Sequence, residues 1–117
     1  MFAHLNDTEP EYSSPEKYSA MINEYFNDLL DNGPLFSSKW VRGRELGNSS
    51  YSLVQMVTGA SIEVVMVKMP KREEELVVIT NRRIGTGSST QYEYIEPKAD
   101  ALMLAVMRSI GYLRGQE

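Results

Sequence analysis

Two arginines, two glycines and several hydroxyl side chains follow one another in the segment NRRIGTGSST, residues 81–90. Glycine-rich segments can direct backbone N–H groups at a phosphate, and arginines add charge for the same ligand. Such a site is strongest where the segment enters a helix, but the chain continues here as TQYEYI, which alternates like a strand. We therefore predict a mobile hairpin loop of about eight residues. A partner-binding loop and a weak anion site are the alternatives, the latter built from Arg82, Arg83, Gly85, Gly87, Ser88 and Ser89.

A tryptophan and two arginines alternate at positions 40, 42 and 44. Alternate residues of a strand share one face, so Trp40, Arg42 and Arg44 are predicted to place an indole beside two guanidinium groups. This patch could dock an acidic peptide or stack nucleic-acid bases. In the alternative interpretation it is an edge strand whose charges discourage aggregation and whose Gly43 marks a bulge.

Groups that commonly act in catalysis are scarce. The chain has no cysteine and one histidine, His4, which precedes the first predicted helix. A cysteine nucleophile, and within the fold a histidine-based triad or a two-histidine metal site, are therefore excluded. Carboxylates remain at Glu63, Glu93 and Asp100, but acids that alternate along a strand usually face solvent. The sequence favours a protein that is not an enzyme and that has neither cofactor nor metal.

Charge is unevenly distributed along the chain, whose net charge is −4. Residues 1–36 contain seven acidic side chains and one lysine, whereas residues 37–117 contain eleven basic and nine acidic ones. The acidic part is either a solvated helix face or a surface that meets a basic partner. Nucleic acid is disfavoured as a partner, because that affinity depends on Lys and Arg contacts with phosphates.

The length and composition of the chain, and its lack of membrane and signal-peptide patterns, predict one cytoplasmic domain. A chain of 117 residues with 42% hydrophobic residues can build a single core. We expect a flexible lead-in over residues 1–12 and one domain over residues 13–117. No apolar run approaches the roughly 18 residues that span a bilayer, and the N-terminus lacks the pattern of a signal peptide, so no membrane partner is expected.

The clearest helix pattern follows Ser13, which with Glu16 fits a capping box. Apolar residues then recur with helical spacing until Asn32-Gly33-Pro34 ends the pattern; they are Tyr18, Met21, Ile22, Tyr25, Phe26, Leu29 and Leu30. A second helix is predicted over residues 98–113. Between the helices the apolar period changes to two, which predicts strands over residues 37–46, 50–58, 61–69, 75–81 and 90–95.

Short connections join these strands, so we predict an antiparallel meander. The expected fold is α+β, a two-layer sandwich with both helices on one face of a five-stranded sheet. Two features of the sequence provide more apolar surface than such a monomer can bury. The second to fourth strands are apolar on both faces, and the segment ALMLAVM, residues 101–107, is apolar nearly all round its helix.

This apolar surplus has two interpretations. The sheet could curl around the second helix as a half-barrel, or the surplus could be an interface, which is the interpretation we favour. The candidate interface residues are Val54, Met56, Val65, Val67, Met103 and Met107, with Trp40, Arg42 and Arg44. We expect a small regulatory or accessory binding protein, chaperone- or inhibitor-like, that acts as a homodimer or with a protein partner. The alternative is a small-ligand module with Arg82 and Arg83 at the mouth of a pocket between sheet and helices.

Overall fold

The predicted N-terminal helix is α2, Ser19–Asp31, in a computed structural model that describes residues 11–36 and 38–114. Its apolar stripe faces inward and buries Ile22, Phe26 and Leu29. The predicted capping box at Ser13 is wrong, because that residue ends a strand, β1, Glu11–Ser13, and a 3₁₀ turn over Glu16–Tyr18 leads into the helix. Ser13 pairs with Met66, so pairing with a distant strand overrides the local capping preference.

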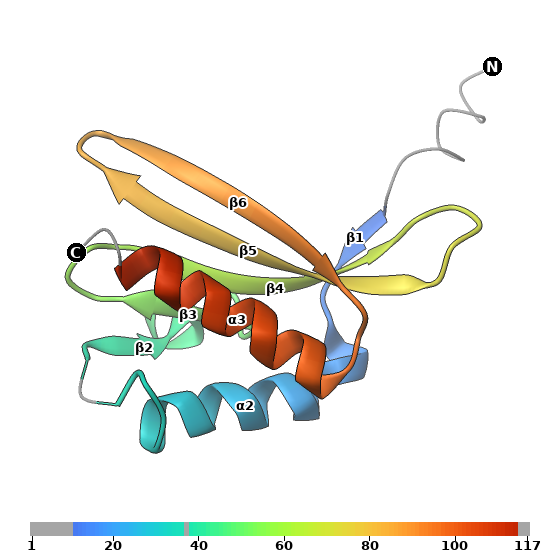
Figure 1. Cartoon of the computed structure of the whole chain (residues 1–117), viewed down its shortest axis with the longest axis horizontal. Helices are drawn as coiled ribbons and strands as arrows, with labels where there is room; N and C mark the ends of the chain where they lie inside the picture. The colour runs from blue at the N-terminus through green and yellow to red at the C-terminus, as the bar shows by residue number, and fades with distance from the viewer. Residues whose placement is uncertain (1–10, 37, 115–117) are drawn as a thin grey trace.

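The chain after α2 forms the predicted antiparallel meander, followed by helix α3, Ala99–Arg114 (Figure 1). The strands are β2, Trp40–Arg42; β3, Ser52–Gln55; β4, Ser61–Lys68; β5, Glu74–Ile84; and β6, Gly87–Ile95. β1 is a sixth strand, which was not predicted. It pairs with residues 66–68 of β4, next to residues 61–63, which pair with β3. Residues 11 and 12 of the predicted lead-in thus belong to the sheet, and residues 1–10 lie outside the described residues.

Two predicted strands are shorter than expected. The strand predicted over residues 37–46 is only β2, because a 3₁₀ turn follows over Gly43–Leu46. The strand predicted over residues 50–58 ends at Gln55, whose side-chain oxygen accepts hydrogen bonds from the backbone N–H groups of Val57 and Thr58, both at 2.7 Å. Because these N–H groups donate to a side chain, they are not available for pairing with a neighbouring strand, and β3 ends there.

The eight-residue loop predicted between the last two strands is wrong. β5 and β6 continue as a hairpin until Ile84 pairs with Gly87, leaving Gly85 and Thr86 as a two-residue turn. Gly85 has φ of +56°, as the first central residue of a type II′ hairpin turn requires. The segment therefore consists mostly of paired strand, and the hairpin extends beyond Ser61, the first residue of β4 (Figure 1).

One hydrophobic core lies between the helices and one face of the sheet. Its helical part includes Phe26 from α2 and Leu102, Val106 and Ile110 from α3. Its sheet part comes from alternate residues of each strand, which on β4 are Ile62 and Val64 with the partly buried Met66. Both helices thus cover the same face, as predicted. Within residues 11–36 and 38–114 no helix lies on the opposite face, which we call the outer face (Figure 1).

Two glycine substitutions should move stability in opposite directions. A Cβ at Gly43 would lie 1.8 Å from Ser52 Oγ, which donates a hydrogen bond to Ser49 O, so Gly43→Ala should destabilise the fold by about 1–3 kcal/mol. A Cβ at Gly111 in α3 meets no atom within 4 Å, so Gly111→Ala should stabilise it by about 0.5–1 kcal/mol. Urea unfolding of both variants beside the wild type measures these differences. A destabilised Gly111→Ala chain would contradict a helix that continues through residue 111.

Candidate functional site

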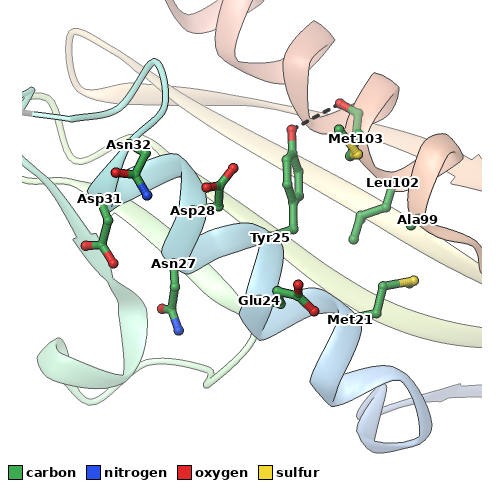
Figure 2. A pocket seen from close by; sticks show the side chains of 10 residues that line it. All are labelled: Met21, Glu24, Tyr25, Asn27, Asp28, Asp31, Asn32, Ala99, Leu102 and Met103. Carbon is green, nitrogen blue, oxygen red and sulfur yellow. Dashed lines mark hydrogen bonds between the residues drawn. The ribbon is translucent and has the colours of Figure 1, made fainter.

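A groove of about 690 Å³ lies between α2 and the first turns of α3, and we call it the acidic groove (Figure 2). Its lining residues are Met21, Glu24, Tyr25, Asn27, Asp28, Asp31, Asn32, Ala99, Leu102 and Met103. Tyr25 rises from α2 towards α3, and its hydroxyl donates a hydrogen bond to Met103 O at 3.3 Å. Burial, together with the charge of Asp28, raises the pKa of this phenol, which keeps its proton on the donor.

Three carboxylates on α2 give the groove its charge. Glu24, Asp28 and Asp31 follow one another at spacings of four and three residues, and all three are exposed. Among the described residues that line the groove there is no lysine or arginine. The ion pairs within residues 11–36 and 38–114 are Lys17–Glu74, Arg72–Glu75, Lys98–Glu96 and Arg108–Glu93, none of which involves these acids. The groove is thus an uncompensated negative surface with the methionine side chains of Met21 and Met103 on its walls.

An exposed apolar stripe on α3 adjoins the groove through Met103. This methionine stripe consists of Met103, Leu104 and Met107, whose exposed fractions are 48%, 60% and 45%. The intervening residues of the same segment, including Ala105 and Val106, are fully buried. α3 is therefore apolar on its solvent-exposed side as well as on its core side. The sheet does not enclose this helix as a half-barrel would.

The outer face of the sheet is apolar too, but part of it is covered from within the chain. Tyr12 on β1 and Tyr94 on β6 reach across the strands between them, and their hydroxyls lie 3.2 Å apart. This hydrogen bond raises the pKa of Tyr94. Val67 pairs with Tyr12, and Val77 pairs with Tyr94. Both valines lie on the outer face and are fully buried.

Beside the tyrosine pair the outer face is open. A shallow hollow there is lined by Tyr12, Val65, Ile79, Tyr92 and Tyr94. The sequence identified Val65 and Val67 as interface candidates but missed Tyr12, because its segment was predicted to be a lead-in. Of the other apolar candidates, Val54 is buried and Met56 is exposed in the turn after β3.

The predicted Trp40–Arg42–Arg44 patch is not one strand face, because Arg44 lies in the 3₁₀ turn. Arg42 is only 4% exposed, and its guanidinium lies 5.4 Å from the centre of the Phe26 ring. It donates hydrogen bonds to the side chains of Asn23 and Asn27 and, at 2.6 Å, to Ser50 O. These acceptors are all neutral, and desolvation lowers the pKa of the Arg42 guanidinium. Arg42 thus connects α2 to the sheet and does not reach a surface partner.

The candidate anion ligands lie along the β5–β6 hairpin and do not form a cradle. Arg82 stacks on Tyr112 of α3, with 5.0 Å from its guanidinium carbon to the ring centre, and Arg83 lies beside Gly59. The cavity that both arginines line, together with Trp40, measures about 30 Å³, which is room for water but not for a metabolite. The remaining candidates, Gly85, Gly87, Ser88 and Ser89, continue along the hairpin end.

The carboxylates considered for catalysis are dispersed. Glu93 points to the helical side of the sheet and pairs with Arg108 of α3 through two hydrogen bonds. Glu63 lies on the outer face of β4, and Asp100 accepts a hydrogen bond from the N–H of Ala101 at 2.9 Å. Among the described residues, no three His, Cys, Asp or Glu side chains gather as metal ligands, and no helix there has the length and hydropathy of a membrane span.

Replacing Arg42 tests whether it holds α2 to the sheet. Lysine keeps the charge but lacks the planar group that serves three acceptors, so Arg42→Lys should lower the free energy of unfolding by about 1–3 kcal/mol. Arg44→Lys, at an exposed position in the adjoining turn, should change it by less than about 0.5 kcal/mol. Chemical denaturation followed by tryptophan fluorescence gives both values. Equal effects of the two substitutions would contradict the structural role of Arg42.

Comparisons of the chain with models of protein families, with curated proteins and with solved structures gave no match.

Proposed function

We propose that this protein binds a protein partner through the acidic groove and the methionine stripe. One observation carries the proposal: an exposed apolar surface that continues from Met21 through Met103 to Met107 is bordered by carboxylates, and none of the described residues that line the groove is a lysine or arginine. Apolar surface left exposed on a small domain commonly marks an interaction site. Methionine side chains suit such a surface because they adapt to the shape of a partner.

The chemistry of the groove selects a basic amphipathic segment as its occupant. A helix laid between α2 and α3 would place apolar side chains against Met21 and Met103. Lysines or arginines on its flanks would meet Glu24, Asp28 and Asp31. Exposed charge pairs of this kind guide association and weaken as salt is added. The apolar contacts would supply most of the affinity, and the charges would select the partner.

The small-ligand alternative has weaker support. A negatively charged groove does not favour an anionic metabolite, and the cavity of about 30 Å³ beside Arg82 and Arg83 is too small to hold one. We therefore keep protein binding as the single proposed function.

A display experiment tests the proposal without a known partner. A random peptide library is selected on the wild-type protein, and the peptides recovered are compared with those recovered on a Met103→Glu/Met107→Glu variant. We expect wild-type selection to enrich sequences with helically spaced apolar residues and flanking Lys or Arg. A synthetic peptide of that consensus should bind the variant at least about tenfold more weakly. Its affinity for the wild type should also fall with added salt.

The matched control adds the same two charges at exposed apolar positions outside the groove. Val57 and Ile84 are exposed and do not line it, so Val57→Glu/Ile84→Glu should bind the peptide as the wild type does. Far-UV circular dichroism shows whether each variant keeps its helices. The proposal would be overturned by enriched peptides that lack basic residues, or by a consensus peptide that loses no affinity for the groove variant.

A further inference from the structure

β6 is a long strand at one edge of the sheet that residues 11–36 and 38–114 form. Its nine residues pair with β5 along one side, and among the described residues it has no other strand neighbour. The opposite edge of the sheet is different, because β2 has three residues and runs directly into a 3₁₀ turn. A paired strand of this length directs a row of N–H and C=O groups outward, which can template pairing with another strand.

The usual protection of an edge is missing from β6. Its sequence, GSSTQYEYI, contains no proline and no lysine, and its one charged residue is Glu93. That carboxylate is held by Arg108 of the same chain, so it is neutralised on the helical side of the sheet. On the outer face the strand shows Tyr92 and Tyr94, which are 60% and 49% exposed. The edge therefore presents hydrogen-bonding groups and aromatic surface without an opposing charge.

We propose that two copies of the chain associate by pairing β6 with β6, antiparallel, around a two-fold axis at Tyr92. Pairing of β6 with β6 involves the sheet edge alone and does not depend on the function proposed for the groove. An antiparallel pair of identical strands is self-complementary, as the interface of a two-fold dimer must be. The pairing would join the two sheets into one continuous sheet and satisfy the outward-facing backbone groups of both edges.

Side-chain chemistry selects this register. With Tyr92 opposite its own copy, each Thr90 lies opposite Tyr94 of the other copy, so the outer face gains one aromatic pair and two aromatic–threonine pairs. Aromatic pairs and pairs of aromatic with β-branched residues are among the stabilising cross-strand contacts. On the helical side each Glu93 lies opposite Gln91 of the other copy, so the two carboxylates do not face each other. A register centred on Glu93 would place like charges directly opposite, which is unfavourable.

Disulfide trapping tests the register, since the chain has no cysteine of its own. Tyr92→Cys places one thiol at the proposed axis, where antiparallel partners are close enough for a disulfide. Ser88→Cys is the matched control on the same strand and the same face, four positions from the axis, where its copy would be out of reach. We expect mild oxidation to convert the Tyr92→Cys chain to covalent dimer and to leave Ser88→Cys without cross-links. Sedimentation equilibrium of the wild type should give twice the mass of the chain.

Charge pairing provides a second readout that needs no oxidation. Tyr92→Lys and Tyr92→Glu should each sediment as monomers, because like charges would meet at the axis, and an equimolar mixture should recover the dimer. Circular dichroism checks that both variants fold. A wild-type monomer at the highest concentration reached would overturn the proposal. Equal cross-linking at positions 88 and 92, or a dimer that persists in both charged variants, would show that the copies associate elsewhere or not through this register.

Discussion

Two helices can cover only one face of this sheet, and most features of the molecule follow from that limit. α2 and α3 both pack on the face that carries Ile62 and Val64, where they form the single core. β4 and β5 are nevertheless apolar on their other face, through residues such as Val65 and Val77. Burial of apolar surface is the main favourable term in folding, so this second face needs another cover. The chain supplies part of that cover itself, through the tyrosines of β1 and β6.

The helical layer also exposes apolar side chains, those of the methionine stripe. The polar residues in and beside this layer either stabilise the fold or form the surface. Arg42 lies inside, where it joins α2 to the sheet through neutral acceptors. The carboxylates of α2 have no such role and remain on the surface beside Met103. On α2, the asparagines that accept hydrogen bonds from the buried Arg42 and the exposed acidic border next to the apolar surface are therefore separate features. The contacts of Arg42 stabilise the fold, and the acidic border gives the exposed apolar surface a negative charge.

The sequence predicted the features that depend on local periodicity. The helical stripe from Ile22 to Leu29, the antiparallel meander and the apolar outer face of β4 are all present. Features that depend on distant contacts could not be predicted. β1 exists because it pairs with the far end of β4, and Arg42 is buried because Asn23 and Asn27 are placed to receive it. The β5–β6 hairpin continues through polar residues because backbone pairing, which has no signature in side-chain hydrophobicity, extends it to Gly85.

The position of β1 also has a consequence for the order of folding. Every other neighbouring pair of strands is consecutive in the chain, so the sheet from β2 to β6 can grow by closing short loops. β1 must instead close a loop that contains α2, β2 and β3 before it reaches β4, and long loops carry a larger entropy cost. Non-local contacts of this kind form slowly relative to local ones. The Tyr12–Tyr94 contact should therefore be among the last to form. Until it forms, the side chains of Val67 and Val77 are exposed to water each time the chain folds.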